Sequence, residues 1–370
     1  MNAPTTSSAP ARHVDPAAIE RELAALWRAE AEAHKNAGGD GKPLARTLLL
    51  NLLVFAPDQA SAGRARDDVV ALTSRQPSRA LLMVADDRAP GPGIDAWVSI
   101  FCTTPQGNGA ARVCGEQITV EASGPAILDL PGTILPLLLA NLPTFLWWQA
   151  GLPFAHPVFD SLSRVVDRVV LDSLTFADPL ENFAEVVRAI REERFPAIVT
   201  DLGWARLTPW RSLTAQIFDP QAMRPYLDQM ERVRVTCYEG SPALAWLFAG
   251  WFASRLEWQL ASREVAEMRF EGGQTIELAT VPAGDETPGY FAAVELRARA
   301  GAVFEVARLP HHCAVTRLNV GGMRTEHVVP VRQETSAEWL GRELNRLAHS
   351  ATFEAAVSLI SNLQPLTSNL

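Results

Sequence analysis

A long apolar run near the start of the sequence constrains the fold more than any other feature. Thr47 to Phe55 is almost wholly apolar and is followed by Pro57 and Asp58, so it predicts a strand buried on both faces. A predicted helix, Arg64 to Ser74, comes next, and a second apolar strand, Ala80 to Ala85, follows it. Two strands that flank a helix pair in parallel through a right-handed connection. The order therefore predicts an open, mostly parallel sheet.

Further strands extend this sheet. Ala96 to Thr103 and Ala111 to Glu121 flank a Gly-Asn-Gly turn, which is typical of an antiparallel hairpin. Two short apolar segments, Thr144 to Trp148 and Arg168 to Asp172, are also predicted to be strands. Helices are predicted from Pro131 to Asn141 and, before the sheet, from Pro16 to about Asn36, where the apolar stripe is Ile19, Leu23, Leu26 and Trp27. Residues 15–177 are therefore expected to form a Rossmann-like α/β domain with an antiparallel insertion.

The second half of the chain has a different pattern. Asp178-Pro-Leu-Glu predicts a helix start, and further helices, including Pro225 to Val233, are expected as far as Leu260, with one strand, Arg234 to Tyr238, among them. After Val265 the hydrophobic period changes to two, which predicts strands joined by Gly and Pro turns, and two helices close the chain. Residues 178–370 are expected to form an α+β domain, and the polar, small residues 1–14 are expected to be a disordered tail. A length of 370 residues suits two domains.

Charge and hydropathy exclude some classes of partner. The net charge is −9 and the pI about 5.4, which argues against a nucleic-acid surface. The most apolar stretch, Ile134 to Trp148, contains two prolines and is shorter than the roughly 20 residues that span a bilayer. Residues 1–16 contain no apolar core of a signal peptide. We expect a soluble cytoplasmic protein with no membrane contact.

The cysteines indicate a reducing compartment. Cys102, Cys114, Cys237 and Cys313 are scattered along apolar stretches, and none forms a CxxC pair. This pattern predicts buried free thiols.

Motifs for phosphate binding fail on inspection. Gly107-Asn108-Gly109 joins two predicted strands and continues to Arg112 where a dinucleotide fingerprint needs a third glycine. Gly41-Lys42 is followed by Pro43, which cannot hold magnesium as the Ser or Thr of a P-loop does. We expect no cofactor.

Motifs for catalysis and metal binding are also missing. The sequence has no GxSxG elbow and no HExxH. His311-His312-Cys313 is a candidate metal cluster, but adjacent strand residues point to opposite faces, so a surface turn is the better interpretation. Asp86-Asp87 follows a strand end, where a solvated turn is again favoured over a ligand site. We expect no catalytic residue, no metal and no enzymatic activity.

One aromatic and basic segment stands apart from the rest of the chain. Asp201 to Arg211 places two indoles and two guanidiniums around one predicted helix start. Trp and Arg are the residues most enriched at interface hot spots, so the segment predicts a docking site for a protein partner. The candidates are Trp204, Arg206, Trp210 and Arg211. The alternative is that the two rings belong to the core and the arginines pair with local acids.

The same segment carries a family resemblance. DLGWARLTPWRSLTAQIFD, Asp201 to Asp219, resembles the signature of the OpcA family, the glucose-6-phosphate dehydrogenase assembly proteins. Other segments are similar in kind and order: RQPSRALLMV from Arg75, NLPTFLWWQAGLP from Asn141, DRVVLDS from Asp167 and ALAWLFAGWFASRLEW from Ala243. The resemblance covers most of the chain after about residue 40. Two positions depart from it: Gln76 stands where the family often has His, and Gly203 where a polar residue is usual.

The resemblance implies a non-catalytic partner that assists assembly of the glucose-6-phosphate dehydrogenase oligomer and activates it in the oxidative pentose phosphate pathway. Cyanobacterial members are linked to redox control through thiols, which we do not transfer to these cysteines. Two alternatives stay open. One is a sugar-phosphate or nucleotide-binding protein, or an enzyme, that uses the strand ends near Asp86 and Trp148. The other is a purely structural assembly factor that leaves the kinetics of the dehydrogenase unchanged.

Overall fold

The computed structural model describes residues 5–11, 15–36, 46–73, 75–86, 91–103, 113–283, 291–346 and 348–361. The chain divides into two compact units. Unit 1 contains Met1–Leu171, Phe195–Val199 and Ser336–Leu347, and unit 2 contains Asp172–Arg194, Thr200–Thr335 and Ala348–Leu370. The chain passes from unit 1 to unit 2 after Leu171, and it returns to unit 1 for Phe195–Val199 and again for Ser336–Leu347. The single domain boundary expected at residue 177 stays a prediction.

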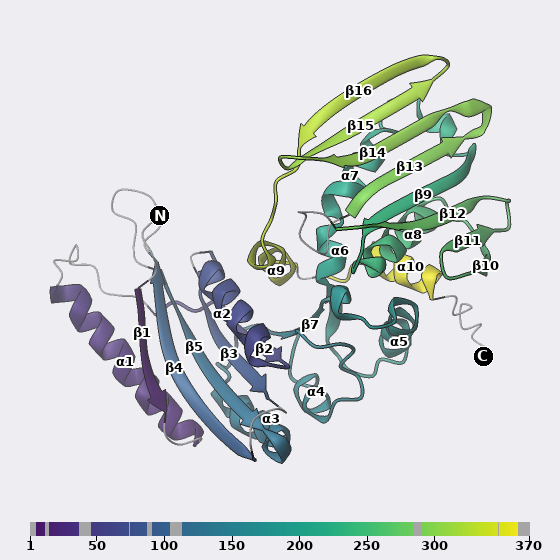
Figure 1. The fold of residues 1–370 in the computed structure, drawn as a ribbon. Helices are drawn as coiled ribbons and strands as arrows, with labels where there is room; N and C mark the ends of the chain where they lie inside the picture. The colour runs from purple at the N-terminus through teal and green to yellow at the C-terminus, as the bar shows by residue number, and fades with distance from the viewer. Residues whose placement is uncertain are drawn as a thin grey trace. The chain divides into compact units, whose positions relative to one another are not determined.

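The first sheet is an eight-stranded, mostly parallel sheet in the order β1-β4-β5-β3-β2-β6-β7-β8 (Figure 1). Its strands are β1 Thr5–Ala11, β2 Leu50–Ala56, β3 Ser78–Ala85, β4 Gly93–Thr103, β5 Val113–Ser123, β6 Thr144–Trp148, β7 Arg168–Leu171 and β8 Ile198–Asp201. The pairs β2–β3, β3–β5, β2–β6 and β6–β7 are parallel, whereas β4 is antiparallel to both β5 and β1. The predicted Rossmann-like sheet with an antiparallel insertion is therefore confirmed.

Short helices and one long helix accompany this sheet. Within unit 1 the structure contains α1 Pro16–Asn36, α2 Gln59–Thr73, α3 Leu130–Ile134, α4 Pro157–Leu162 and α9 Ser336–Leu344, with 3-10 turns at Gly124–Asp129 and Leu135–Leu137. Three of the four predicted stripe residues of α1, Ile19, Leu23 and Trp27, are buried, whereas Leu26 is half-buried. The helix runs alongside β1 and β4 (Figure 1). The helix expected from Pro131 to Asn141 is shorter, because the chain turns into a 3-10 segment after Ile134.

The N-terminal tail differs from the expected disorder. Thr5–Ala11 form β1, which pairs with β4 from Thr5 opposite Cys102 to Ala11 opposite Ala96. The outer edge of β4 offers unpaired backbone groups, and an extended segment of any polar composition can satisfy them. The remainder of the expected tail, residues 1–4 and 12–14, lies outside the described residues.

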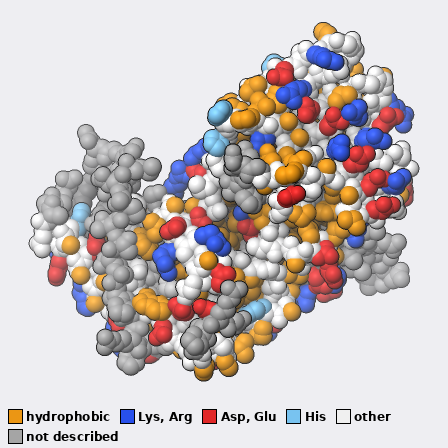
Figure 2. Space-filling view, in the orientation of Figure 1, with side chains coloured by type: hydrophobic (Ala, Val, Ile, Leu, Met, Phe, Trp, Pro, Cys, Tyr) orange, Lys and Arg blue, Asp and Glu red, His pale blue; other side chains and the backbone are white. Residues whose placement is uncertain are grey.

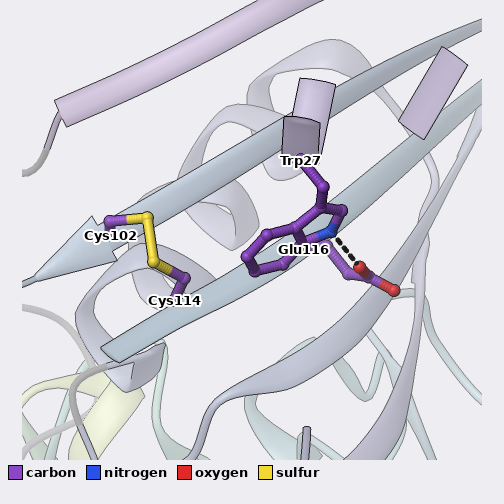
Figure 3. Close-up of a disulfide and its surroundings, with 4 residues drawn as sticks. All are labelled: Trp27, Cys102, Cys114 and Glu116. Atoms are coloured by element: carbon purple, nitrogen blue, oxygen red, sulfur yellow. Dashed lines mark hydrogen bonds between the residues drawn. A yellow bond between two sulfur atoms is a disulfide. The ribbon is translucent and has the colours of Figure 1, made fainter. Parts of the chain in front are cut away.

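The prediction of four free thiols is wrong for one pair. Cys102 at the end of β4 and Cys114 at the start of β5 lie directly opposite each other, with Cα atoms 4.1 Å apart, and form a disulfide (Figure 3). The register of the hairpin, which is set by the sheet and not by the spacing of the cysteines, brings the two sulfurs together. Cys237 and Cys313 are free, as the sequence predicts. Burial raises the pKa of the Cys237 thiol.

A buried ionic cluster around Glu116 ties α1 to the sheet, and Figure 3 shows its hydrogen bond from Trp27 beside the disulfide. The carboxylate of Glu116 on β5 accepts hydrogen bonds from Trp27 Nε1 at 2.7 Å and from Arg79 Nε at 2.5 Å. Arg46 donates two more to the same carboxylate, each at 2.9 Å. Arg79, the second residue of β3 and part of the family-like RQPSR segment, also pairs with Glu20 of α1. Each buried charge is thus partnered, which is the condition for burying charges at all.

Unit 2 contains the second eight-stranded sheet, in the order β10-β11-β12-β9-β13-β14-β15-β16 (Figure 1). Its strands are β9 Met230–Tyr238, β10 Leu260–Arg263, β11 Glu267–Phe270, β12 Thr275–Val281, β13 Phe291–Ala298, β14 Val303–Leu309, β15 Cys313–Val320 and β16 Met323–Pro330. Its helices are α5 Pro179–Arg191, α6 Leu202–Arg206, α7 Thr208–Gln216, α8 Pro242–Arg255 and α10 Ala351–Ile360. The sheet is antiparallel except for β9–β12, which agrees with the predicted α+β class.

The central helix of unit 2 is α8, which is apolar on all sides and buried along most of its length. Gly250 lets α10 approach closely, because a Cβ atom at this position would lie 2.5 Å from the carbonyl oxygen of Ala356. One predicted helix in this unit, Pro225 to Val233, is wrong. A 3-10 turn at Arg224–Tyr226 leads directly into β9, where Val233, Val235 and Cys237 alternate as buried residues with a period of two.

Candidate functional site

The segment singled out by the sequence forms two short consecutive helices after β8. Asp201, the last residue of β8, caps α6, and its carboxylate accepts a hydrogen bond from the backbone N–H of Trp204 at 2.8 Å. The same carboxylate accepts from Ser173 twice, from the backbone N–H at 2.7 Å and from Oγ at 2.9 Å. One buried carboxylate therefore joins the start of α6 to the turn after β7.

The electrostatics of Asp201 follow from its burial. Loss of hydration raises its pKa to about 6, and the negative charge of Asp172 acts in the same direction. The hydrogen bonds from Ser173 and Trp204 oppose the increase, because they favour the ionised form. Burial therefore makes the carboxylate costly to ionise, although three hydrogen-bond donors favour its charged form.

Arg206, the last residue of α6, forms an ion pair with the second acid, Asp172. Its guanidinium donates from Nη1 to Asp172 Oδ1 at 2.6 Å and from Nη2 to Asp172 Oδ2 at 2.8 Å. This is the two-pronged geometry that makes arginine–carboxylate pairs strong. The Arg206 side chain is only 9% exposed. Arg206 is therefore mainly a structural ion-pair partner.

Arg211 on α7 lies over the ring of Trp204. Its guanidinium carbon is 3.5 Å from the ring centroid, and the same guanidinium donates to the carbonyl oxygen of Trp204 at 2.8 Å and to Thr208 Oγ1 at 3.2 Å. Trp204 is buried and also contacts Phe353 of α10, with 5.6 Å between ring centroids. Arg211 remains half-buried.

Trp210 points into the core of unit 2. It is buried against Phe291 of β13 at 5.3 Å between ring centroids, and Arg308 of β14 lies 5.1 Å from its ring. Trp204 and Trp210 are therefore core residues and Arg206 pairs with a local acid, as the alternative interpretation of the sequence has it.

We refer to Asp172, Ser173, Asp201, Trp204, Arg206 and Arg211 as the Asp201 corner. Sequence reasoning found three of its members and missed Asp172, Ser173 and the capping role of Asp201. The available signal was the pair Asp172-Ser173 at the end of the family-like DRVVLDS segment. Gly203 completes the corner, because a Cβ atom there would lie 2.1 Å from Ser173 Oγ.

The strand ends of unit 1 are the other place where an α/β sheet can hold a ligand. The strand order reverses between β2 and β6, which is the position where open α/β sheets bind ligands beyond the carboxyl ends of the strands. Phe55 of β2 and Trp148 of β6 stack there with ring centroids 3.8 Å apart and planes 4° apart. His156 lies edge-on to both rings, at 5.2 Å from each centroid. Buried aromatic rings thus occupy the sheet's switch point.

The turn after β2 also differs from a phosphate-binding turn. In dinucleotide-binding folds this turn is rich in glycine, and the pyrophosphate sits at the N-terminus of the following helix. Here the turn begins Pro57-Asp58, and Asp58 Oδ1 accepts a hydrogen bond from the backbone N–H of Ser61 at 2.7 Å. A carboxylate already holds the helix N-terminus and would repel a phosphate. Asp86 follows β3, whereas Asp87 lies outside the described residues.

The candidate metal cluster is a hairpin turn. His311 and His312 join β14 to β15 with φ angles of 59° and 56°, in agreement with the predicted surface turn. Within the described residues, no group of three or more His, Cys, Asp or Glu side chains is arranged to hold a metal ion. No helix in that part of the chain is long and apolar enough to cross a membrane.

Comparison with known proteins adds family evidence to this geometry. The family model for the glucose-6-phosphate dehydrogenase subunit N-terminal domain matches residues 69–188. The model for the C-terminal domain of the same subunit, OpcA, matches residues 197–357 and so includes most of the Asp201 corner.

Two curated relatives match most of this chain, and a solved structure resembles it at low sequence identity. The OxPP cycle protein OpcA of Synechocystis sp. is 26% identical over 332 residues, which cover 83% of this chain and 66% of the relative. The OxPP cycle protein OpcA of Synechococcus elongatus is 30% identical over 294 residues, with 72% and 64% covered. The chain thus spans somewhat less than two thirds of the length of these relatives. Glucose-6-phosphate 1-dehydrogenase from Mycobacterium avium is a structural neighbour at TM-score 0.44 and 11% identity, with 84% of this chain and 91% of that chain covered.

Proposed function

Because the chain belongs to the OpcA family of glucose-6-phosphate dehydrogenase assembly proteins, we propose that it is a non-catalytic assembly factor and allosteric activator of that enzyme. It docks on the dehydrogenase oligomer, which opens the oxidative pentose phosphate pathway. The Asp201 corner is the observation that carries the proposal at the level of residues. The most specific family segment folds there into a fixed arrangement of charges and rings.

A fixed corner suits docking better than catalysis. The Asp201 carboxylate is held by hydrogen bonds from Ser173 and Trp204, and the Arg206 guanidinium is paired with Asp172. Groups already committed to one another in the free protein lose little conformational entropy when a partner binds. The occupied switch point at Phe55 and Trp148 supports the same conclusion, because it leaves no ready place for a nicotinamide cofactor.

The four docking candidates then take different roles. Arg211 is the contact residue, because the residue is only half-buried and its guanidinium is stacked on the fixed ring of Trp204. Trp204 and Trp210 support the surface from below, and Arg206 fixes α6 through its ion pair with Asp172. The exposed side of α7, with Ser212, is the surface that these residues hold in place.

The energetic requirement is modest. A specific interface buries about 1,600 Å² in total. A tenfold activation needs only about 1.4 kcal/mol of differential binding between two states of the enzyme. One stacked arginine and its neighbours can supply this amount when they contact one enzyme state and not the other.

The test uses the purified full-length chain and the cognate dehydrogenase. Arg211→Ala is expected to weaken complex formation and the kinetic effect at least tenfold while urea unfolding still shows a cooperative transition. Arg224→Ala is the matched control, because Arg224 is an exposed arginine beyond α7 whose side chain donates to the backbone carbonyl of Asp219. If both variants weaken the complex equally, or neither weakens it, Arg211 is not a contact residue of the interface.

The alternative of a nucleotide or sugar-phosphate site is tested on the isolated chain. NADP or glucose 6-phosphate at 100 times a dissociation constant would stabilise a binding protein by about 2.7 kcal/mol. We expect no thermal shift with either compound. A clear shift that Asp58→Ala alters would favour ligand binding at the start of α2 over docking.

A further inference from the structure

The outer edge of the second sheet is unusual for a strand that faces solvent. β16, Met323–Pro330, is the last strand of the sheet, and no other strand among the described residues borders its outer side (Figure 1). Nearly all of its residues are exposed, including two large apolar side chains, Met323 at 77% and Val328 at 55%. An exposed row of unpaired backbone groups is a template for pairing with another chain.

The two edges of this sheet differ in how they are protected. The opposite edge strand, β10, has four residues and an irregular register between Leu260 and Ser262, two features that prevent edge pairing. β16 has eight residues, pairs with β15 without a register shift, and contains no lysine. Its one proline, Pro330, comes at the last position. The long regular edge is therefore left open for a partner strand.

Charges of alternating sign lie side by side across β14, β15 and β16, and the last of them is on the edge strand. Arg317 of β15 donates from Nη1 to Glu305 of β14 at 2.9 Å and from Nε to Glu326 of β16 at 2.8 Å. Figure 2 shows basic and acidic side chains interspersed over the surface where Figure 1 draws these strands. Glu326 is the outermost member and its side chain is 55% exposed. The next strand outward would continue the alternation by placing a positive charge opposite Glu326.

β16 itself carries that positive charge in the required position. Arg324 and Glu326 are two residues apart, so they lie on the same face of the strand. In an antiparallel pair of two β16 strands with Thr325 opposite Thr325, each Arg324 lies opposite Glu326 of the other copy. The same register places Met323 opposite His327 and Gly322 opposite Val328, and it closes by a twofold axis through Thr325.

We propose that two copies of this protein associate through antiparallel pairing of their β16 strands in this register. The dimer extends the second sheet across the twofold axis, with two Arg324–Glu326 pairs formed between the copies. The charge self-complementarity of the edge selects a second copy as its occupant. The proposal concerns a different surface from the Asp201 corner and does not depend on the proposed function.

The test measures self-association of the full chain by sedimentation at several concentrations, followed by native mass spectrometry of mixed variants. Arg324→Glu and Glu326→Arg each replace two attractive cross-strand pairs by two repulsive ones. Each variant alone is expected to raise the dimer dissociation constant at least tenfold, about 1.4 kcal/mol. An equimolar mixture of the two variants restores association as a heterodimer, because both opposite-charge pairs form only there.

The controls separate edge pairing from other modes of association. Arg297→Glu and Glu295→Arg reverse a similar pair, 2.7 Å apart, on the interior strand β13 of the same sheet and should leave the dimer unchanged. Loss of the dimer in these controls would indicate stacking of sheet faces and overturn the proposal. A wild-type chain that stays monomeric at all concentrations would also overturn it. A monomer whose β16 amides become protected from exchange only when the dehydrogenase is added would assign the edge to that enzyme.

Discussion

Replacing Gly203 with alanine puts a methyl group where the Asp201 corner has no room. The new Cβ atom would lie 2.1 Å from Ser173 Oγ, 2.8 Å from Asp201 Oδ2 and 3.2 Å from Leu244 Cδ2. The Ser173 hydroxyl must move by more than an ångström, so its 2.9 Å hydrogen bond to Asp201 is lost. Overpacking of this kind costs about 1–3 kcal/mol, and the loss of a hydrogen bond to a charged group costs about 1.5–3 kcal/mol. The higher helix propensity of alanine offsets only up to about 1 kcal/mol of this loss in stability.

The expected net loss is about 2–4 kcal/mol in the free energy of unfolding, measured by urea denaturation. Ser173→Ala removes the atom in closest contact, so the double variant should be less destabilised than the sum of the two single variants by at least about 1 kcal/mol. Gly132→Ala in α3 is the control, because a Cβ atom there meets nothing within 4 Å. A neutral Gly203→Ala, or strictly additive effects in the double variant, would show that the corner is not packed as described.

Three other predictions concern buried groups. The pKa of Asp201 is about 6 in the folded protein and about 3.9 when unfolded. Protonation therefore stabilises the fold, and lowering the pH from 7 to 4 should raise the free energy of unfolding relative to Asp201→Asn by up to roughly 3 kcal/mol, as urea titrations at each pH can check. Cys102→Ala with Cys114→Ala should lower stability by about 2–4 kcal/mol, and dithiothreitol should bring the wild type to the same value. Gly250→Ala should destabilise unit 2 by more than about 2 kcal/mol in the same assay, because its methyl group would meet the backbone of α10.

The parallel sheet was predictable because its strands are buried on both faces. The run from Leu50 to Ala56 is buried throughout, and a short apolar run that Pro57 and Asp58 end is typical of a central strand. β16 was not predicted for the opposite reason. Its sequence, Met323 to Pro330, is exposed on both faces, so no alternation of apolar and polar residues marks it as a strand.

The disulfide and the Asp201 corner depend on contacts that no local pattern encodes. Cys102 meets Cys114 through the register of β4 and β5, and register is a property of the whole sheet. Asp172 and Arg206 are 34 residues apart and meet because β7 and β8 end side by side. The arginines were functional candidates because of their residue type. Residue type does not tell whether an arginine pairs with an acid in the same chain or with a group in another protein.

The decisive measurement is the steady-state kinetics of the cognate glucose-6-phosphate dehydrogenase, with and without a saturating amount of this chain, alongside the mass of the complex. We predict a complex heavier than the enzyme oligomer and a change of at least tenfold in substrate affinity or turnover, which Arg211→Ala weakens and Arg224→Ala does not. Formation of the complex without any kinetic change would show that the protein is a structural assembly factor and not an activator. Absence of both complex and kinetic change would contradict the proposed function.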